Sequence, residues 1–353
     1  MASESDHIVA ETAARIFSDL ADAQTINSAG DNRWKTPLWR AIADAGLPQA
    51  WTSEAQGGAS LADGFAIIGI AGRHALPVPL AETMLAGWLL AQGGIEAPAG
   101  KMTVAPVRPR DRISRNADGT VSGRAGAIPF AKDAERIAVV ANDGKGATIA
   151  LLNAADCRID DGETLAGDAA NRVTFDRVKP VTAARAPDSF DVTALLLMGA
   201  TMRATQIAGA LEAILAMSVR YANERVAFER PIGKFQAVQQ NLARLAGETA
   251  AALASAGSAA DTIGHSSAFD DTLLLEAASA KIRTGEAAAE GASIAHQVHG
   301  AIGFTSEHVL HRFTLRMLSW RDDFGTESYW AERLGSMVAL RGADRFWPML
   351  AAR

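Results

Sequence analysis

The chain has little of what several protein classes need. Cys157 is its only cysteine, so the chain can form no internal disulfide and no cysteine-based zinc site. Its 34 Lys and Arg residues are outnumbered by 40 Asp and Glu, and this balance offers nucleic-acid phosphates no broad basic face. Apolar runs such as 194–199 fall far short of the ~20 residues that cross a bilayer. We therefore expect neither a nucleic-acid partner nor a membrane span.

The first residues also lack the basic start and apolar run of a secretory signal, so we expect a cytoplasmic protein. With 353 residues, of which 48% are hydrophobic, the chain is long enough for two or three packed modules. Stability must come from packing these modules together.

The pattern of apolar residues divides the chain into three parts. Residues 1–98 show helical spacing, as at Val9, Ala13 and Ile16, and predict an N-terminal helical domain. Residues 99–187 hold short β-branched runs separated by glycine-containing turns, which predict a central β domain. The strands expected there are 103–107, 137–140, 148–152 and 173–178.

Long Ala-rich stretches dominate the third part, residues 188–353. They predict helices over 192–225, 236–262 and 272–298. Because small residues let helices approach closely, we expect these stretches to form a C-terminal helical bundle. This order of modules describes an architecture and names no reaction.

One segment of the expected bundle carries chemistry. Over residues 225–236 a long helix must stop at Pro231 and restart at once, which leaves a basic corner with apolar edges. Arg225 could meet a pyrophosphate through charge-assisted hydrogen bonds, while Phe228 and Ile232 offer a face to an aromatic ring. The corner suits a dinucleotide. The alternative is an ordinary helix–helix turn with Arg225 in a surface ion pair.

A second segment, residues 297–305, ends a helix near two glycines, Gly300 and Gly303. Glycine lets a backbone approach a ligand closely, so the amides here could hold a phosphate or a ribose. The alternative is a plain helix C-cap.

Together the two segments resemble the acyl-CoA dehydrogenase pattern Arg-x-x-Phe-Gly-x-Pro-Ile-x-x-Phe-Gln followed by Gln-x-x-Gly-Gly-x-Gly-Phe-Thr. The resemblance implies a mainly α fold with an N-terminal helical domain, a central β-barrel-like domain and a C-terminal four-helix bundle. It implies a flavoprotein oxidoreductase with FAD as cofactor and an acyl-CoA substrate. It also implies a homo- or hetero-oligomer, a dimer or tetramer with FAD at a subunit interface, and an electron-transfer protein as acceptor.

Carried over by position, the resemblance assigns a set of residues to FAD. They are Arg225, Ala227, Phe228, Ile232 and Phe235 against the FAD of a neighbouring subunit, Gln297, Gly300 and Ala301 at its adenosine diphosphate end, and Thr326 near the flavin. Two positions depart from the pattern, because Glu229 replaces the usual glycine and Ala301 replaces the second glycine of a pair. Both residues keep a backbone amide.

The resemblance also identifies a missing group. Dehydrogenation beside a thioester needs a carboxylate to take the α-proton while hydride leaves for the flavin. In most of the family this glutamate precedes a Gly-Thr pair, where this chain has Phe324. In other members it lies on a long helix, at about Gly199 or Ala200 here. Asp323 and Glu327 flank the vacant place, and we expect them to be surface acids. A small shift of the loop could bring either carboxylate into the position of the base.

The loop that normally embraces flavin and substrate is replaced by residues 102–111, without the usual Thr-Glu-Pro-Gly-like run. Short chains of this kind resemble halves of heteromeric enzymes of lipid or steroid catabolism that act on bulky acyl-CoA esters. Three interpretations stay open. They are an FAD-dependent acyl-CoA dehydrogenase or a subunit of one, a non-catalytic partner subunit, and a flavin monooxygenase of the same fold.

Two histidine pairs lie at metal-ligand spacing on the expected helices, His296 with His299 and His308 with His311. An acidic third ligand at zinc-site spacing does not accompany them. We expect no metal and interpret these histidines as packing or polar contacts.

Overall fold

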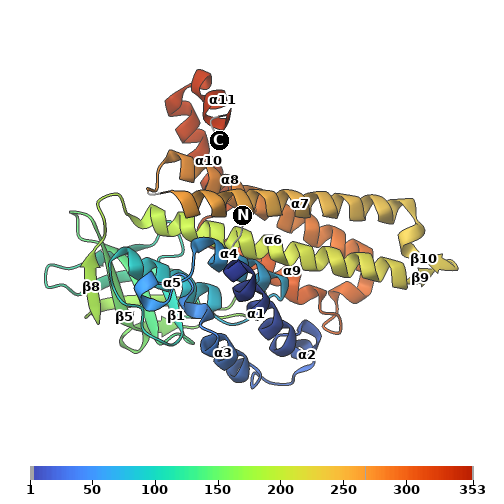
Figure 1. Cartoon of the computed structure of the whole chain (residues 1–353), viewed down its shortest axis with the longest axis horizontal. Helices are drawn as coiled ribbons and strands as arrows, with labels where there is room; N and C mark the ends of the chain where they lie inside the picture. The colour runs from blue at the N-terminus through green and yellow to red at the C-terminus, as the bar shows by residue number, and fades with distance from the viewer. Residues whose placement is uncertain (1–3, 267, 352–353) are drawn as a thin grey trace.

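The computed structural model describes residues 4–266 and 268–351 and begins with a helical layer (Figure 1). Its elements are α1 (Glu4–Leu20), α2 (Ala23–Ser28), α3 (Lys35–Asp44), the 3-10 turns η1 (Leu47–Gln49) and η2 (Glu54–Gln56), α4 (Leu61–Arg73) and α5 (Leu80–Gln92). Ser60 and Asp63 start α4 with a reciprocal capping box. Every side chain from Leu80 to Leu90 of α5 is buried, so this helix belongs to the core.

One eight-stranded sheet follows the helical layer. It contains β1 (Met102–Ala105), β2 (Arg112–Arg115), β3 (Val121–Pro129), β4 (Arg136–Asn142), β5 (Ala147–Asn153), β6 (Arg158–Asp160), β7 (Ala170–Val178) and β8 (Thr182–Arg185), with a 3-10 turn η3 (Ala154–Asp156) before β6. The strand order is β6-β7-β3-β2-β4-β5-β8, and β1 pairs in parallel with β4. The sheet curls into the barrel-like shape that the resemblance implies.

Four of the eight strands were not predicted from the sequence. β1, β4, β5 and β7 overlap the expected β-branched runs, whereas β2, β3, β6 and β8 do not. β2 reads Arg-Ile-Ser-Arg with only Ile113 buried, and the register between β3 and β7 shifts twice. Pairing with neighbouring strands, rather than local preference, makes these segments strands.

Three long helices dominate the C-terminal bundle: α6 (Val192–Glu224), α7 (Gln236–His265) and α8 (Asp271–His299). A hairpin of β9 (Val226–Ala227) and β10 (Arg230–Pro231) and the 3-10 turn η4 (Ile232–Lys234) connect α6 to α7. After α8 come η5 (Gly300–Phe304), α9 (Leu310–Trp320), α10 (Glu327–Arg341) and α11 (Ala343–Ala351). The three long helices begin and end within a few residues of the expected bounds.

Helix α6 joins the two ends of the molecule. Its 33 residues span ~50 Å, from the β sheet to the β9–β10 hairpin (Figure 1). Helix α4 packs against α6 at Gly209, where a Cβ would come within 2.1 Å of the Gly69 carbonyl oxygen. Glycine at this position therefore permits the close contact of the two helices.

Among the described residues, α6 is the helix whose length and apolar composition would allow it to cross a membrane. However, 94% of its most apolar window is buried inside the molecule. Its apolar side chains pack against protein, as in the core helix of a globular fold.

Candidate functional site

The vacant base position lies in the turn between α9 and α10. The Phe324 side chain is fully buried there, and its ring lies against Gly199 of α6. A Cβ built on Gly199 would be 2.3 Å from the Phe324 ring. The two places where the family resemblance expects a glutamate are therefore in contact, and neither residue has a group that titrates.

The same turn is hydrogen-bonded to the β domain. The Phe324 amide donates to the Val107 carbonyl oxygen at 3.1 Å, and the Trp330 indole donates to the Phe324 carbonyl oxygen at 3.0 Å. Val107 belongs to the 102–111 segment, which takes the place of the flavin loop. Both backbone groups of Phe324 are thus engaged within the protein.

Asp323 and Glu327 are not the unengaged surface acids that the sequence predicted. The Asp323 side chain is 16% exposed and accepts a hydrogen bond from Arg203 Nε at 2.9 Å. Burial raises the pKa of Asp323, and the charge of Arg203 opposes this rise. Glu327 is 21% exposed and accepts a hydrogen bond from Arg321 Nε at 2.7 Å. Because an unpaired buried carboxylate is costly, both acids have an arginine partner.

Arg203 of α6 centres a buried charge network that the sequence analysis missed. Its guanidinium donates to Glu82 of α5 at 2.6 Å and to Gln206 at 2.6 Å, in addition to Asp323. Burial raises the pKa of Glu82, and Arg203 opposes this rise. A signal was present, because Glu82 and Arg203 are isolated charges within long apolar stretches and such charges need partners.

Lys281 of α8 is a second buried cation beside the turn. Its ammonium group donates to the carbonyl oxygens of Arg321 and, at 3.0 Å, Gly325. Burial lowers the pKa of Lys281 to about 8. Lys281 ties the turn to α8, just as Arg203 ties it to α5 and α6.

The Arg225 corner lies at the opposite end of α6. The Arg225 carbonyl oxygen accepts a hydrogen bond from the Ile232 amide at 2.8 Å, so the β9–β10 hairpin folds back onto the helix end. Arg225 is exposed, while Ala227, Ile232 and Phe235 are half-buried. The Phe228 side chain is 90% exposed. This corner presents a cation and an aromatic ring to whatever lies outside the chain.

The second motif, residues 297–305, lies at the same end of the bundle. Its exposed residues Gln297, Gly300 and Ala301 line a groove of about 560 Å³. A Cβ built on Gly300 would meet nothing within 4 Å, so the backbone is open on that side. Tyr221, one turn before Arg225, stacks on His299 with ring centroids 4.5 Å apart. This contact joins the two motifs.

Thr326 lies apart from these residues, beside the Phe324 turn. It caps α10, and its hydroxyl accepts a hydrogen bond from the Tyr329 amide at 3.3 Å. The residues assigned to FAD by resemblance therefore fall into two groups, separated by most of the length of the bundle.

The two groups differ in how open they are. Around Arg225 and Gly300, an exposed guanidinium and an exposed ring lie near an open stretch of backbone, and a guanidinium is a group that pairs with phosphates. Around Phe324, the turn and the β-domain segment that should enclose a flavin ring are hydrogen-bonded to each other.

The histidines near the second motif make local contacts. Nδ1 of His299 lies 2.8 Å from the Ala295 carbonyl oxygen, and Nε2 of His296 lies 3.0 Å from the Thr314 hydroxyl. Burial lowers the pKa of His296, His299 and His308. Within the part of the chain that the structure describes, no three His, Cys, Asp or Glu residues are placed to hold a metal ion.

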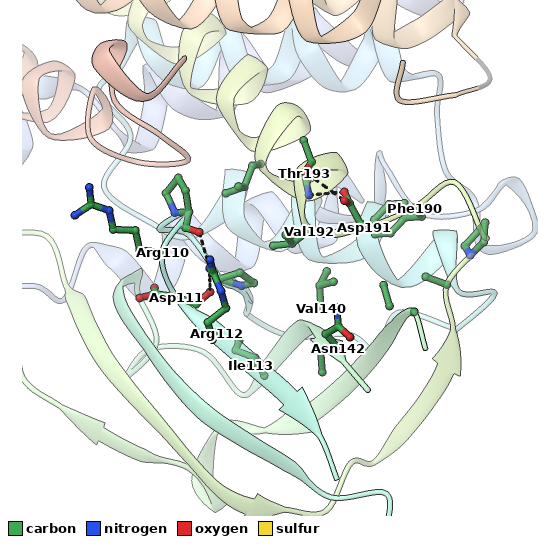
Figure 2. Close-up of a pocket in the computed structure, with 18 of the residues that line it drawn as sticks. Arg110, Asp111, Arg112, Ile113, Val140, Asn142, Phe190, Asp191, Val192 and Thr193 are labelled. Atoms are coloured by element: carbon green, nitrogen blue, oxygen red, sulfur yellow. Dashed lines mark hydrogen bonds between the residues drawn. The ribbon is translucent and has the colours of Figure 1, made fainter. Parts of the chain in front are cut away.

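A pocket of about 750 Å³, not predicted from the sequence, lies where the sheet meets α6 and α10 (Figure 2). Asp191 opens α6 in its wall by accepting a hydrogen bond from the Thr193 amide at 2.7 Å. Arg112 donates to the Pro109 carbonyl oxygen at 2.8 Å. Leu196, one turn before Gly199, also lines the pocket, which therefore reaches the neighbourhood of the turn between α9 and α10.

An N-terminal helical layer, a curled sheet and a C-terminal bundle of long helices make up the fold that the solved acyl-CoA dehydrogenase structures share. Residues 191–335 match the family model of the acyl-CoA dehydrogenase C-terminal domain. In its C-terminal helical bundle the chain is thus similar to the acyl-CoA dehydrogenases.

Relatives along nearly the whole chain agree with this assignment. The chain is 27% identical over 319 residues to acyl-CoA dehydrogenase IpdE2 of Mycobacterium tuberculosis, covering 89% of this chain and 91% of that one. A chain of the ChsE4–ChsE5 complex from the same organism superposes with a TM-score of 0.85 at 22% identity, over 96% of this chain and 98% of that one. A variant of the Tcur3481–Tcur3483 steroid ACAD superposes with a TM-score of 0.82 at 26% identity, over 95% and 98%. These superpositions confirm the predicted fold class.

Proposed function

We propose that the chain is a base-less subunit of a heteromeric, FAD-dependent acyl-CoA dehydrogenase. In this role it completes an FAD site with its ADP half-site, by which we mean Arg225, Phe228, Gln297, Gly300 and Ala301. A second kind of chain supplies the catalytic carboxylate. The observation that carries the proposal is the contact between Phe324 and Gly199, because it fills both places where the family holds a base.

The residues of this chain would bind and orient the cofactor. When bound, FAD supplies the hydride acceptor for dehydrogenation of the acyl-CoA. Arg225 would offset the charge of its pyrophosphate, and the exposed Phe228 ring would cover an apolar face. The open backbone at Gly300 and Ala301 would accommodate the adenosine end. None of these roles requires a proton transfer by this chain.

Two of the structural relatives support a two-chain enzyme and a substrate class. The ChsE4–ChsE5 structure is a complex of two differently named chains, and the Tcur3481–Tcur3483 protein is a steroid ACAD. We propose by analogy a bulky, steroid-derived acyl-CoA ester as substrate. An electron-transfer protein as acceptor and a cytoplasmic location complete the proposal.

The test is co-purification. The chain is expressed alone and with an acyl-CoA dehydrogenase chain that carries the catalytic carboxylate, and flavin absorbance and acyl-CoA oxidation are recorded for each preparation. We expect flavin and activity in the pair and little of either in the chain alone. Arg225→Ala should release flavin during gel filtration, whereas Arg244→Ala, an exposed arginine on α7, should not. A strictly monomeric chain that keeps its flavin and turns over acyl-CoA would contradict the proposal.

A further inference from the structure

Exposed arginines of the β domain gather around one short stretch of β3, on the face of the sheet that the core leaves uncovered. We infer that they form a binding site for the diphosphate group of a small molecule. The four residues, called the arginine cluster, are Arg108, Arg112, Arg124 and Arg172. The inference does not depend on the proposed function, because no residue of the cluster takes part in it.

Strand pairing places two of the arginines side by side. Arg112 of β2 is directly opposite Arg124 of β3, and both side chains are exposed. Side chains at such positions have Cβ atoms about 5 Å apart, and like charges there destabilise a sheet. This pair is therefore unfavourable unless an anion lies between the two guanidinium groups.

An irregularity in β3 brings in a third arginine. The register between β3 and β7 shifts between Ala125 and Ile128. Arg172 of β7 lies opposite this bulge, and its exposed side chain shares the face of Arg124 because the residues on either side of it are buried. Bulges re-aim side chains and occur next to functional sites. The bulge thus directs Arg172 toward the other two.

The loop before β2 holds the fourth arginine over the same stretch. A Cβ built on Gly126 would come within 3.0 Å of Nη1 of Arg108, so this guanidinium group lies directly above the glycine. Arg112 donates from Nη1 to the carbonyl oxygens of Pro109 and Asp111, at 2.8 and 2.9 Å, which turns it back toward the same loop (Figure 2). The missing side chain at Gly126 leaves the space in which these groups gather.

The nearby acids are engaged elsewhere. Oδ2 of Asp111 accepts a hydrogen bond from the Gly126 amide at 2.9 Å. Burial raises the pKa of Asp111, and this hydrogen bond and the neighbouring arginine charges oppose the rise. Asp160 of β6 is opposite Arg172 but pairs with Arg158 at 3.2 Å. Neither carboxylate is thus available to balance the cluster.

The arginine cluster therefore keeps its charge for an external anion. Within the part of the chain that the structure describes, none of its members forms an ion pair, whereas Arg177 on the same sheet pairs with Asp118. Guanidinium groups form paired, charge-assisted hydrogen bonds with phosphate oxygens. A diphosphate offers several oxygens and more than one charge, so it can meet several arginines at once.

Calorimetric titration of the full chain with inorganic pyrophosphate tests the site. All proteins carry Arg225→Ala, so that pyrophosphate does not bind at the ADP half-site. We expect one pyrophosphate per chain, and Arg124→Gln should weaken its binding by roughly 10-fold or more, because charge-assisted hydrogen bonds are lost. Arg177→Gln removes an exposed arginine that Asp118 already balances and should leave binding unchanged. Equal binding by the Arg124→Gln protein and its parent would overturn the inference.

The unfolding midpoint supplies a second readout, which a purely structural arginine would not give. Without an anion, Arg124→Gln should raise the midpoint, because it removes the repulsion from Arg112. With saturating pyrophosphate the parent should gain stability, since the ligand binds the folded state, and the variant should gain little. A variant that unfolds below its parent in the absence of anions would show that Arg124 serves the packing of the sheet, and the inference would then be wrong.

Comparison with other anions tests the class of ligand. At equal ionic strength, sulfate and citrate should bind more weakly than pyrophosphate by roughly 10-fold or more, because neither is a diphosphate. ADP that binds more tightly than pyrophosphate would identify a nucleotide as the source of the diphosphate, and equal binding would identify the free anion. Citrate that binds as tightly as pyrophosphate, or heparin that binds where pyrophosphate does not, would overturn the assignment.

Discussion

Arg203 contributes most to holding the turn between α9 and α10 in place. It pairs with both Glu82 of α5 and Asp323 of the turn within a buried network. We expect Arg203→Met to lower the free energy of unfolding by about 3–5 kcal/mol, because two carboxylates lose their partner. Urea unfolding measures this loss. Arg73→Met, which removes an arginine that is 52% exposed and paired with Glu212, should cost less than about 1 kcal/mol.

The cause of that loss can be separated from lost packing. Adding Glu82→Gln and Asp323→Asn to Arg203→Met removes the unpaired charges, so the triple variant should regain part of the stability. If the triple variant is no more stable than Arg203→Met alone, uncompensated charge is not the reason for the loss.

Phe324→Glu places a carboxylate where most of the family has its base. The new side chain would replace a fully buried ring against Gly199 and join Glu82 and Asp323 around one arginine. We expect a lower unfolding midpoint, because a charge enters a buried place. We also expect no gain in acyl-CoA oxidation by the assembled complex, because the hydrogen bond from residue 324 to Val107 still closes the space beside the turn. Phe324→Leu, which stays apolar, should destabilise less. A gain in oxidation by Phe324→Glu would show that substrate reaches this turn.

Lys281 makes the stability of the fold depend on pH in the basic range. The pKa of Lys281 is about 8 in the folded chain, against about 10.4 for an unperturbed lysine. Between these values the unfolded chain binds a proton that the folded chain does not, so stability rises with pH through this window and the penalty is largest below pH 8. Relative to Lys281→Met, the parent chain should gain about 1.4 kcal/mol per pH unit within it. Urea titrations of both proteins at several pH values measure the difference, and parallel curves would contradict the assignment.

At the scale of elements, periodic helices were predictable and irregular contacts were not. The apolar and Ala-rich stretches of α6, α7 and α8 predicted them closely, although residues 194–204 of α6 are buried on every side rather than on one face. The hairpin after Arg225 was predicted as a corner because Pro231 interrupts the helix. The position of the turn between α9 and α10 was not predictable, because it depends on a hydrogen bond between Phe324 and Val107, which are far apart in the sequence.

We expect η5, the turn that contains Gly300 and Ala301, to lose stability at acidic pH. The His299 ring is 3% exposed, stacks on Tyr221 and lies 4.8 Å from the His308 ring. Because burial lowers the pKa of both histidines below 6.5, their contribution to stability is present above that value and is lost as the pH falls. Lowering the pH from about 7.5 to about 5.5 should therefore weaken the ADP half-site.

The weakened ADP half-site should release flavin. Flavin fluorescence after dialysis of the assembled complex measures how much is released. Replacing His308 by Gln removes one of the two facing rings that titrate, so the variant should hold flavin to a lower pH than the parent. Identical release curves for the two proteins would assign the acid sensitivity to other groups.

At the scale of the whole molecule, the chain alone should oxidise straight-chain acyl-CoA esters very poorly. Loss of general-base catalysis by itself costs roughly 10²–10⁴-fold in rate, and the closed space beside the turn between α9 and α10 adds to this loss. A dye-reduction assay on the purified chain, with the co-purified complex as the positive control, measures the difference. Brisk turnover by the chain alone would mean that another residue acts as the base.

Helix α6 carries Arg203, which pairs with Asp323, about a third of the way along its length, and Arg225 of the ADP half-site follows just past its end. A continuous helix fixes direction as well as distance, because each residue turns the chain by about 100°. A single residue inserted in the middle of α6 would rotate the hairpin about the helix axis by a quarter of a turn or more, away from the neighbouring chain, and would hardly lengthen the helix. The number of residues in α6 thus decides which side of the molecule can face a partner. Related chains should therefore differ in the lengths of their loops but keep the same number of residues in α6.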